Sequence, residues 1–140
     1  MVDQKLISGI FNDFLALYLG KKQIGIRPLC EKYENHPMLI GLLSNLDEAT
    51  KIPVPRVMKD AYDLYKEYRG RELEEKEWEQ VAEKTTELYE KWDKNKWCSR
   101  VIIELVSLLD SDDAERRRLA QEVEKEMEEA MRQNEKKDAA

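Results

Sequence analysis

The side chains that most often carry out chemistry in proteins are scarce in this sequence. It holds one histidine, His36, and two cysteines, Cys30 and Cys98, in 140 residues. A nucleophilic cysteine needs a base and a group that orients the base, and His36 is the only imidazole present. A metal site needs a cluster of ligands, which one histidine does not supply. We therefore expect no catalytic residue, no metal site and no cofactor, and we interpret His36 as a half-exposed turn residue.

Carboxylates are abundant, but their pattern is that of helix surfaces. The two densest runs, Glu72–Glu75 and Glu122–Glu129, are interspersed with or followed by basic residues. Exposed faces of long helices are ordinarily charged in this way, whereas acid–base catalysis needs carboxylates in a pocket that shifts their pKa values. The sequence also lacks a Gly-rich phosphate loop, an HExxH motif and a CxxC motif.

The composition predicts long helices. Charged residues make up 39% and hydrophobic residues 41% of the chain, with only 5 Gly and 4 Pro to interrupt it. The charged share exceeds the globular norm of about 25%, as solvated helical faces require. We expect an all-α, single-domain bundle of five to six helices with a long charged C-terminal helix. Residues 1–111 would form the bundle core. Residues 112–140 would form a charged amphipathic helix with a frayed tail, either within the same domain or as a dimerisation arm.

Apolar spacing and capping residues set the expected helix boundaries. The six longer predicted helices cover Asp3–Leu19, Pro37–Ala49, Pro55 to about Gly70, about Glu72–Asp93, Lys96–Leu109 and about Asp113–Gln133, and a short helix covers Pro28–Glu34. Apolar residues nearly encircle Lys96–Leu109, so we expect that helix at the centre of the fold. A short break is expected at Asp110–Asp113, where Asp112 and Glu115 resemble a capping box. The last residues, 134–140, are expected to fray.

Two sets of side chains are candidates for binding a partner. Tyr62, Tyr65 and Tyr68 share one helical stripe and could line a groove between the helix that begins at Pro55 and the next one. Exposed tyrosines are common in the energetic centres of protein interfaces. The second set is the thin apolar stripe on the last helix, which is too narrow to dock strongly on the bundle by itself. Its members are Leu119, Val123, Met127 and Met131.

A basic triplet, Arg116, Arg117 and Arg118, is the feature that could contact phosphate. On a helix these three side chains point in different directions, and acidic residues surround them. A protein that reads DNA usually has a broader basic face, and the net charge of −6 disfavours nonspecific binding to nucleic acid. Nucleic-acid binding is therefore the alternative and not the leading prediction.

The sequence favours a cytoplasmic location. It has no basic segment followed by an apolar run at its start, as a signal peptide has, and its longest apolar runs are too short to cross a bilayer. Two widely separated cysteines are most simply read as a reduced pair. We expect no membrane partner.

Absence of catalytic motifs together with a long amphipathic helix favours a non-enzymatic protein-binding module. Its role would be that of an adaptor, an assembly subunit or an inhibitor of another protein, and its partner would be another protein or a second copy of itself. Small inhibitors from phages or mobile elements often have this character. The first alternative is a nucleic-acid-binding regulator that uses Arg116–Arg118. The second is an enzyme whose pocket would bring together Tyr62, Tyr65 and His36.

Overall fold

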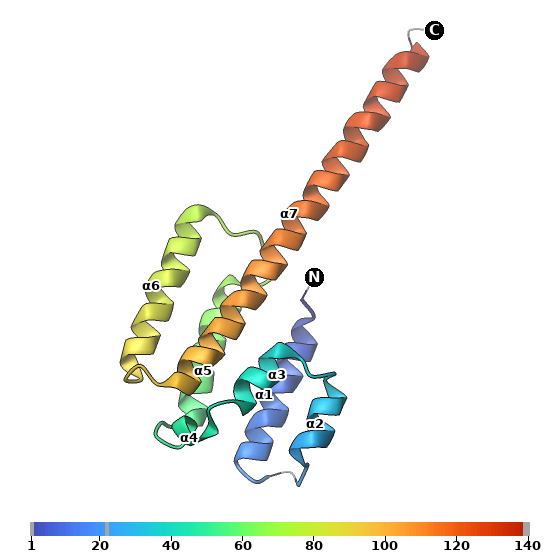
Figure 1. Cartoon of the computed structure of the whole chain (residues 1–140). Coiled ribbons are helices and arrows are strands. Elements are labelled where there is room, and N and C mark those ends of the chain that lie inside the picture. Colours follow the sequence, from blue (N-terminus) through green and yellow to red (C-terminus); the bar gives the residue numbers. More distant parts are fainter. Residues whose placement is uncertain (1, 22, 139–140) are drawn as a thin grey trace.

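The first part of the longest helix is the centre of the fold. In this computed structural model, residues 2–21 and 23–138 are described, with side chains through residue 135. The helices are α1 (Gln4–Tyr18), α2 (Ile26–Lys32), α3 (Pro37–Leu43), α4 (Leu46–Ala49), α5 (Val54–Tyr68), α6 (Glu75–Lys91) and α7 (Lys96–Asp138). α3, α4, α5 and α6 contact α7, and α1 packs against α3 (Figure 1). The described chain is 79% helical without strands, which confirms the all-α prediction.

Trp97 is the largest fully buried side chain among the described residues. It is 0% exposed, and its indole Nε1 donates a hydrogen bond to the backbone oxygen of Leu42, at 2.8 Å. The ring stacks on Phe14 of α1, with 6.1 Å between the ring centroids. Because a buried indole N–H is costly to leave unpaired, this bond fixes how α3 sits on α7. The expectation of a central helix at Lys96–Leu109 agrees with this arrangement.

The start of α7 is fixed by Asn95, as its sequence position suggests. The Asn95 side-chain oxygen accepts a hydrogen bond from the backbone nitrogen of Cys98, at 3.1 Å, which is the geometry of an N-cap. Its side-chain nitrogen donates to the backbone oxygen of Glu48, at 2.9 Å. One side chain therefore both begins the central helix and holds the end of α4 against it.

The predicted helix Pro37–Ala49 is two helices. α3 ends at Leu43, and the Ser44 hydroxyl donates to the backbone oxygen of Gly41, at 2.7 Å. Asn45 then takes a left-handed conformation with φ of 55°, which asparagine tolerates better than most residues. Apolar spacing alone could not reveal this turn, since the spacing of Leu43 and Leu46 also fits one continuous helix.

The predicted break at Asp110–Asp113 is wrong, because α7 runs without interruption from Lys96 to Asp138. The two aspartates do not cap a helix but are buried, Asp112 at 3% and Asp113 at 7% exposure. Asp112 accepts a hydrogen bond from the backbone nitrogen of Val2, at 3.2 Å, and Asp113 accepts one from that of Leu73, at 2.7 Å. The poor helix propensity of aspartate costs at most about 0.7 kcal/mol. That is less than the roughly 1–3 kcal/mol lost when a buried donor has no partner.

Further helix boundaries differ from the predictions. α6 begins at Glu75 and not at Glu72, because Glu74 and Glu77 form a capping box there. α2 begins at Ile26 and not at Pro28, because proline fits anywhere in a first turn, where backbone N–H groups have no partner within the helix. Residues 134–138, which were expected to fray, continue α7. Residues 139 and 140 lie outside the described part of the chain.

The turn of α7 that holds the two aspartates is where the bundle ends. We call Asp112 and Asp113 the aspartate pair. N-terminal to it, α7 buries one face in the core, and C-terminal to Leu119 every described side chain is exposed. Figure 1 shows that α7 extends beyond the other helices and continues alone over its C-terminal part, which ends at Asp138. We call residues 119–135 the arm.

Replacing Asp113 with alanine should destabilise the fold, because the backbone nitrogen of Leu73 would then be buried without an acceptor. The expected loss is roughly 1–3 kcal/mol in the free energy of unfolding, measured by urea denaturation. Asp110→Ala is the matched control, since Asp110 is exposed on the same helix and should change stability by less than about 0.5 kcal/mol. Equal effects of the two substitutions would show that the Asp113 contact contributes nothing.

Candidate functional site

The arm presents a continuous apolar stripe to solvent. Val123 is 55%, Met127 62% and Met131 63% exposed, and Leu119 is half-buried where the arm begins. We call these four residues the seam. They are spaced four apart, and since each residue of an α-helix advances about 100°, they stay within about 120° of one another around the axis. Large apolar side chains in one exposed row are typical of a surface that pairs with another helix.

The seam continues the face that α7 buries inside the bundle. Cys98, Leu105 and Leu109 point to the same side of the helix as Val123 and Met127, by the same count of about 100° per residue. All three bundle residues are at most 2% exposed. The same side of α7 is therefore buried in the hydrophobic core along the first part of the helix and exposed to solvent along the arm.

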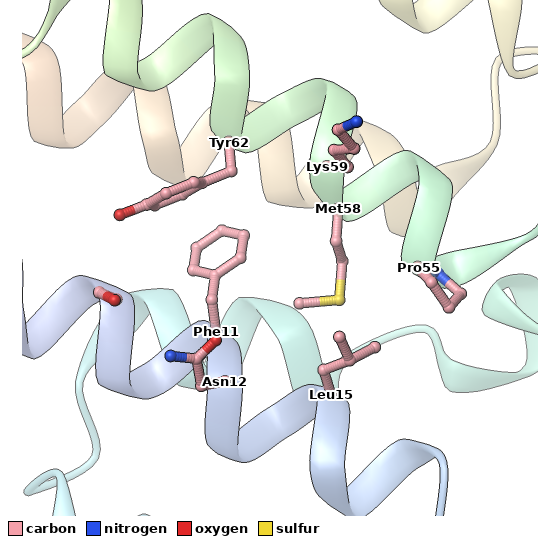
Figure 2. A pocket seen from close by; sticks show the side chains of 8 residues that line it. Phe11, Asn12, Leu15, Pro55, Met58, Lys59 and Tyr62 are labelled. Atoms are coloured by element: carbon pink, nitrogen blue, oxygen red, sulfur yellow. The ribbon is translucent and has the colours of Figure 1, made fainter.

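Tyr62 lines a groove between α1 and α5, whereas the predicted groove lay between α5 and α6. Figure 2 shows Tyr62 of α5 facing Phe11 of α1, with Met58 and Leu15 filling the same space further along. The Tyr62 and Phe11 ring centroids are 5.1 Å apart. Gln4, Ser8 and Asn12 form a polar edge of the groove.

Tyr65 and Tyr68 belong to the core, at 1% and 2% exposure. The Tyr65 hydroxyl donates to the Gln4 side-chain oxygen, at 2.9 Å, and the Tyr68 hydroxyl donates to that of Gln80, at 3.3 Å. Each tyrosine therefore ties α5 to a neighbouring helix. Of the three tyrosines predicted to bind a partner, only Tyr62 is partly accessible in this structure.

Basic side chains surround the open side of Tyr62. Arg69 donates to the Tyr62 hydroxyl, at 3.0 Å, and the Lys66 nitrogen lies 5.8 Å from the centre of the Tyr62 ring. Lys5 and Lys59 line the same groove. The α1–α5 groove is thus lined by basic, polar and apolar side chains, while the arm is acidic with one apolar stripe.

All three arginines of the basic triplet pair with carboxylates one helical turn away. The distances are 2.8 Å for Arg116–Asp112, 3.1 Å for Arg117–Asp113 and 2.9 Å for Arg118–Glu122. Arg117 also donates to the backbone oxygen of Leu73. Since these guanidinium groups are neutralised within the chain, they do not form a free basic face, and no observation favours the nucleic-acid alternative.

The one histidine caps a helix. His36 precedes α3, and its Nδ1 accepts a hydrogen bond from the backbone nitrogen of Met38, at 3.0 Å. The α1–α5 groove that Tyr62 lines does not include His36. Tyr65 is buried. The three residues of the enzyme hypothesis are therefore not brought together in this groove.

Of the two cysteines, Cys98 is fully buried and poorly suited to act as a nucleophile. Both cysteines are free thiols. Burial raises the pKa of Cys98 to about 11, so its reactive thiolate is scarce near neutral pH. Cys30 is half-buried on α2. Within the described residues, no three His, Cys, Asp or Glu side chains gather closely enough to hold a metal ion.

A small ionic cluster joins α1 to α2, and sequence reasoning missed it. The Asp13 carboxylate accepts hydrogen bonds from the Tyr33 hydroxyl, at 2.5 Å, and from the Lys32 nitrogen, at 2.8 Å. Burial, and next the hydrogen bond to Asp13, raise the pKa of Tyr33. Tyr33 also packs against Gly9, where an added Cβ would lie 3.0 Å from its hydroxyl oxygen. The cluster lies at a close helix contact, so it is a structural link and not an open site.

Comparison with known proteins reveals no relative of this chain. No family model, no curated protein and no solved structure matches this chain. Over the described residues, no helix combines the length and apolar character that crossing a membrane requires. The candidate sites therefore rest on geometry alone, and of these the seam has the largest exposed apolar side chains.

Stability should fall on acidification partly through His36. Burial lowers the pKa of His36 from its ordinary value of 6.5, and the charge of Glu104 opposes this shift only in part. The folded state therefore binds fewer protons than the unfolded state between the two pKa values, so the free energy of unfolding decreases as the pH falls through about 6.5. Protonation of Nδ1 would also remove the acceptor for Met38.

The measurement is urea denaturation at about pH 7.5 and about pH 5.5 for the natural chain and for His36→Asn. Asparagine caps helices without titrating, so the variant should lose less stability between the two pH values. An identical loss in both proteins would show that His36 does not contribute to the pH dependence.

Proposed function

We propose that this protein is a non-enzymatic protein-binding module whose binding element is the arm. The observation that carries this proposal is the row formed by Val123, Met127 and Met131, which is more than half exposed on a helix that leaves the bundle. Burying a fully exposed side chain of this size is worth about 1.5–3 kcal/mol, so each of these, little more than half exposed, would contribute roughly half of that when a partner covers it. A helix laid along the seam would bury all of them at once.

The base of the arm is held rigidly, which favours binding. The aspartate pair fixes α7 to the N-terminal segment through Val2 and to the α5–α6 loop through Leu73. A partner therefore meets a helix whose direction is already set, so less conformational entropy is lost on binding. Adaptor, assembly subunit and inhibitor are all roles for such an element, as in the small inhibitors of phages and mobile elements. The partner is another protein or a second copy of this chain.

We also propose a cytoplasmic location. Cys30 and Cys98 are free, and unpaired cysteines are typical of reducing compartments. Mass spectrometry of protein alkylated while the cells are lysed in denaturant, which exposes the buried Cys98, would find both thiols modified. A disulfide that involves either cysteine would contradict the proposal.

The double substitution Val123→Gln and Met127→Gln tests the proposed function. Both side chains are exposed, so the urea midpoint should not change, while the loss of two apolar contacts should weaken partner binding at least tenfold. The measurement is affinity capture from the native cell extract, quantified by mass spectrometry, with light scattering of the purified protein to detect self-association. A specific partner is one that the natural chain retains and the double variant loses.

Lys125→Gln with Arg132→Gln is the matched control. These two side chains are also exposed on the arm but lie on the side away from the seam. This control should retain the partner. Equal capture by the natural chain and both variants, together with a monomer in all three, would contradict the proposed function.

A further inference from the structure

Both edges of the seam are acidic. Glutamates flank it in two rows, one on each edge, and the four that lie beside Val123 and Met127 are all exposed: Glu122 with Glu126, and Glu124 with Glu128. The arm's basic residues, Lys125 and Arg132, lie on the opposite side of the helix. A helix that covers the seam must therefore place its own flanking side chains against two rows of carboxylates.

The charge of these rows is largely uncompensated within the chain. Glu122 pairs with Arg118, at 2.9 Å, near the base of the arm. Among the described side chains, Glu124, Glu126 and Glu128 form no ion pair with a basic residue. Their negative charge is therefore available to a binding partner.

We infer, on the basis of the proposed function, that the seam binds an amphipathic helix of another protein whose apolar side is flanked by Lys and Arg. The apolar seam requires an apolar stripe opposite it, and the flanking charges of two paired helices decide which partners associate. Basic residues on both sides of that stripe would each face a glutamate of the arm. Val123 and Met127 give affinity, and the four glutamates select the partner.

The negative charge of the arm disfavours a second copy of the arm as its partner. Because both edges of the seam are acidic, two arms that pair through their seams bring glutamates together in either a parallel or an antiparallel arrangement. Like charges at such positions are destabilising. Glu126 and Glu124, which lie beside Val123 and Met127, would face carboxylates of the other copy in either arrangement.

The α1–α5 groove of a second copy is a less suitable partner, although it is basic. Lys5, Lys59 and Arg69 would attract the arm, but the apolar side chains Phe11 and Met58 that line the groove are only 6% and 4% exposed. The seam would therefore find little apolar surface to cover there and would gain little from burial. A partner helix with a continuous apolar stripe satisfies both the seam and its edges.

The test uses the full chain and two synthetic helical peptides of about 20 residues, long enough to span the seam. The peptides share one leucine stripe and differ only at the flanking positions, which are all Lys in one and all Glu in the other. Fluorescence anisotropy measures binding to each. We expect the basic peptide to bind at least tenfold more tightly than the acidic one and to bind less tightly as salt is raised.

Two charge-reversed proteins show where the peptide binds. The arm variant carries Glu122→Lys, Glu124→Lys, Glu126→Lys and Glu128→Lys. Its affinity for the basic peptide should be at least tenfold lower than that of the natural chain, and its affinity for the acidic peptide should be higher. The control carries the same change on exposed positions of α6, namely Glu79→Lys, Glu83→Lys, Glu87→Lys and Glu90→Lys. This control should still bind the basic peptide, which separates the arm from a general effect of net charge.

The outcomes separate this inference from the proposed function. Equal binding of both peptides, or retention of the basic peptide by the arm variant, overturns the charge selection and leaves the arm as a binding element. Self-association of the natural chain in light scattering, lost when Val123 and Met127 become glutamine, makes a second copy the partner and overturns the inference alone. A monomer that binds neither peptide overturns both.

Discussion

The helical bundle ends at the turn of α7 that holds two buried carboxylates, those of Asp112 and Asp113. A charged group that leaves water must be hydrogen-bonded, and Asp112 and Asp113 meet this requirement with backbone donors from two distant segments. Arg116 and Arg117 then balance their charge from the next turn of the same helix. The N-terminal segment and the α5–α6 loop consequently converge on one turn of α7. Before that turn α7 buries one face in the core, and after Leu119 its described side chains face solvent.

Much of the fold could be predicted because the signals are local. The helical spacing of apolar residues depends on near neighbours only, so it reveals the all-α class and the central position of the helix that begins after Asn95. The N-cap at Asn95 also depends only on residues up to three positions away. The same holds for Asp3, whose carboxylate accepts hydrogen bonds from the backbone nitrogens of Lys5 and Leu6. The thin apolar stripe of the last helix was expected to dock weakly, and the structure leaves it undocked.

The parts that could not be predicted depend on contacts between distant residues. Asp112 and Val2 are 110 positions apart, and Asp113 and Leu73 are 40 apart, so a pair of aspartates that resembles a cap is in fact a tertiary contact. Tyr65 and Tyr62 share a helical face, yet one is buried against α1 and the other is partly open. Sequence periodicity reveals a shared face but not how deeply each member of it is covered.

The continuity of α7 also bears on how the arm stays helical. The first turn of a helix is the unfavourable one to form, because several residues are ordered for a single hydrogen bond, and later turns add more easily. Here the bundle supplies that nucleus, since the turns around Trp97 and Leu105 are buried before the arm begins. The arm therefore only has to propagate a helix that exists already. Its order should decrease gradually toward the tip, so the end of the arm nearest the bundle is the best-formed part of the surface that it offers.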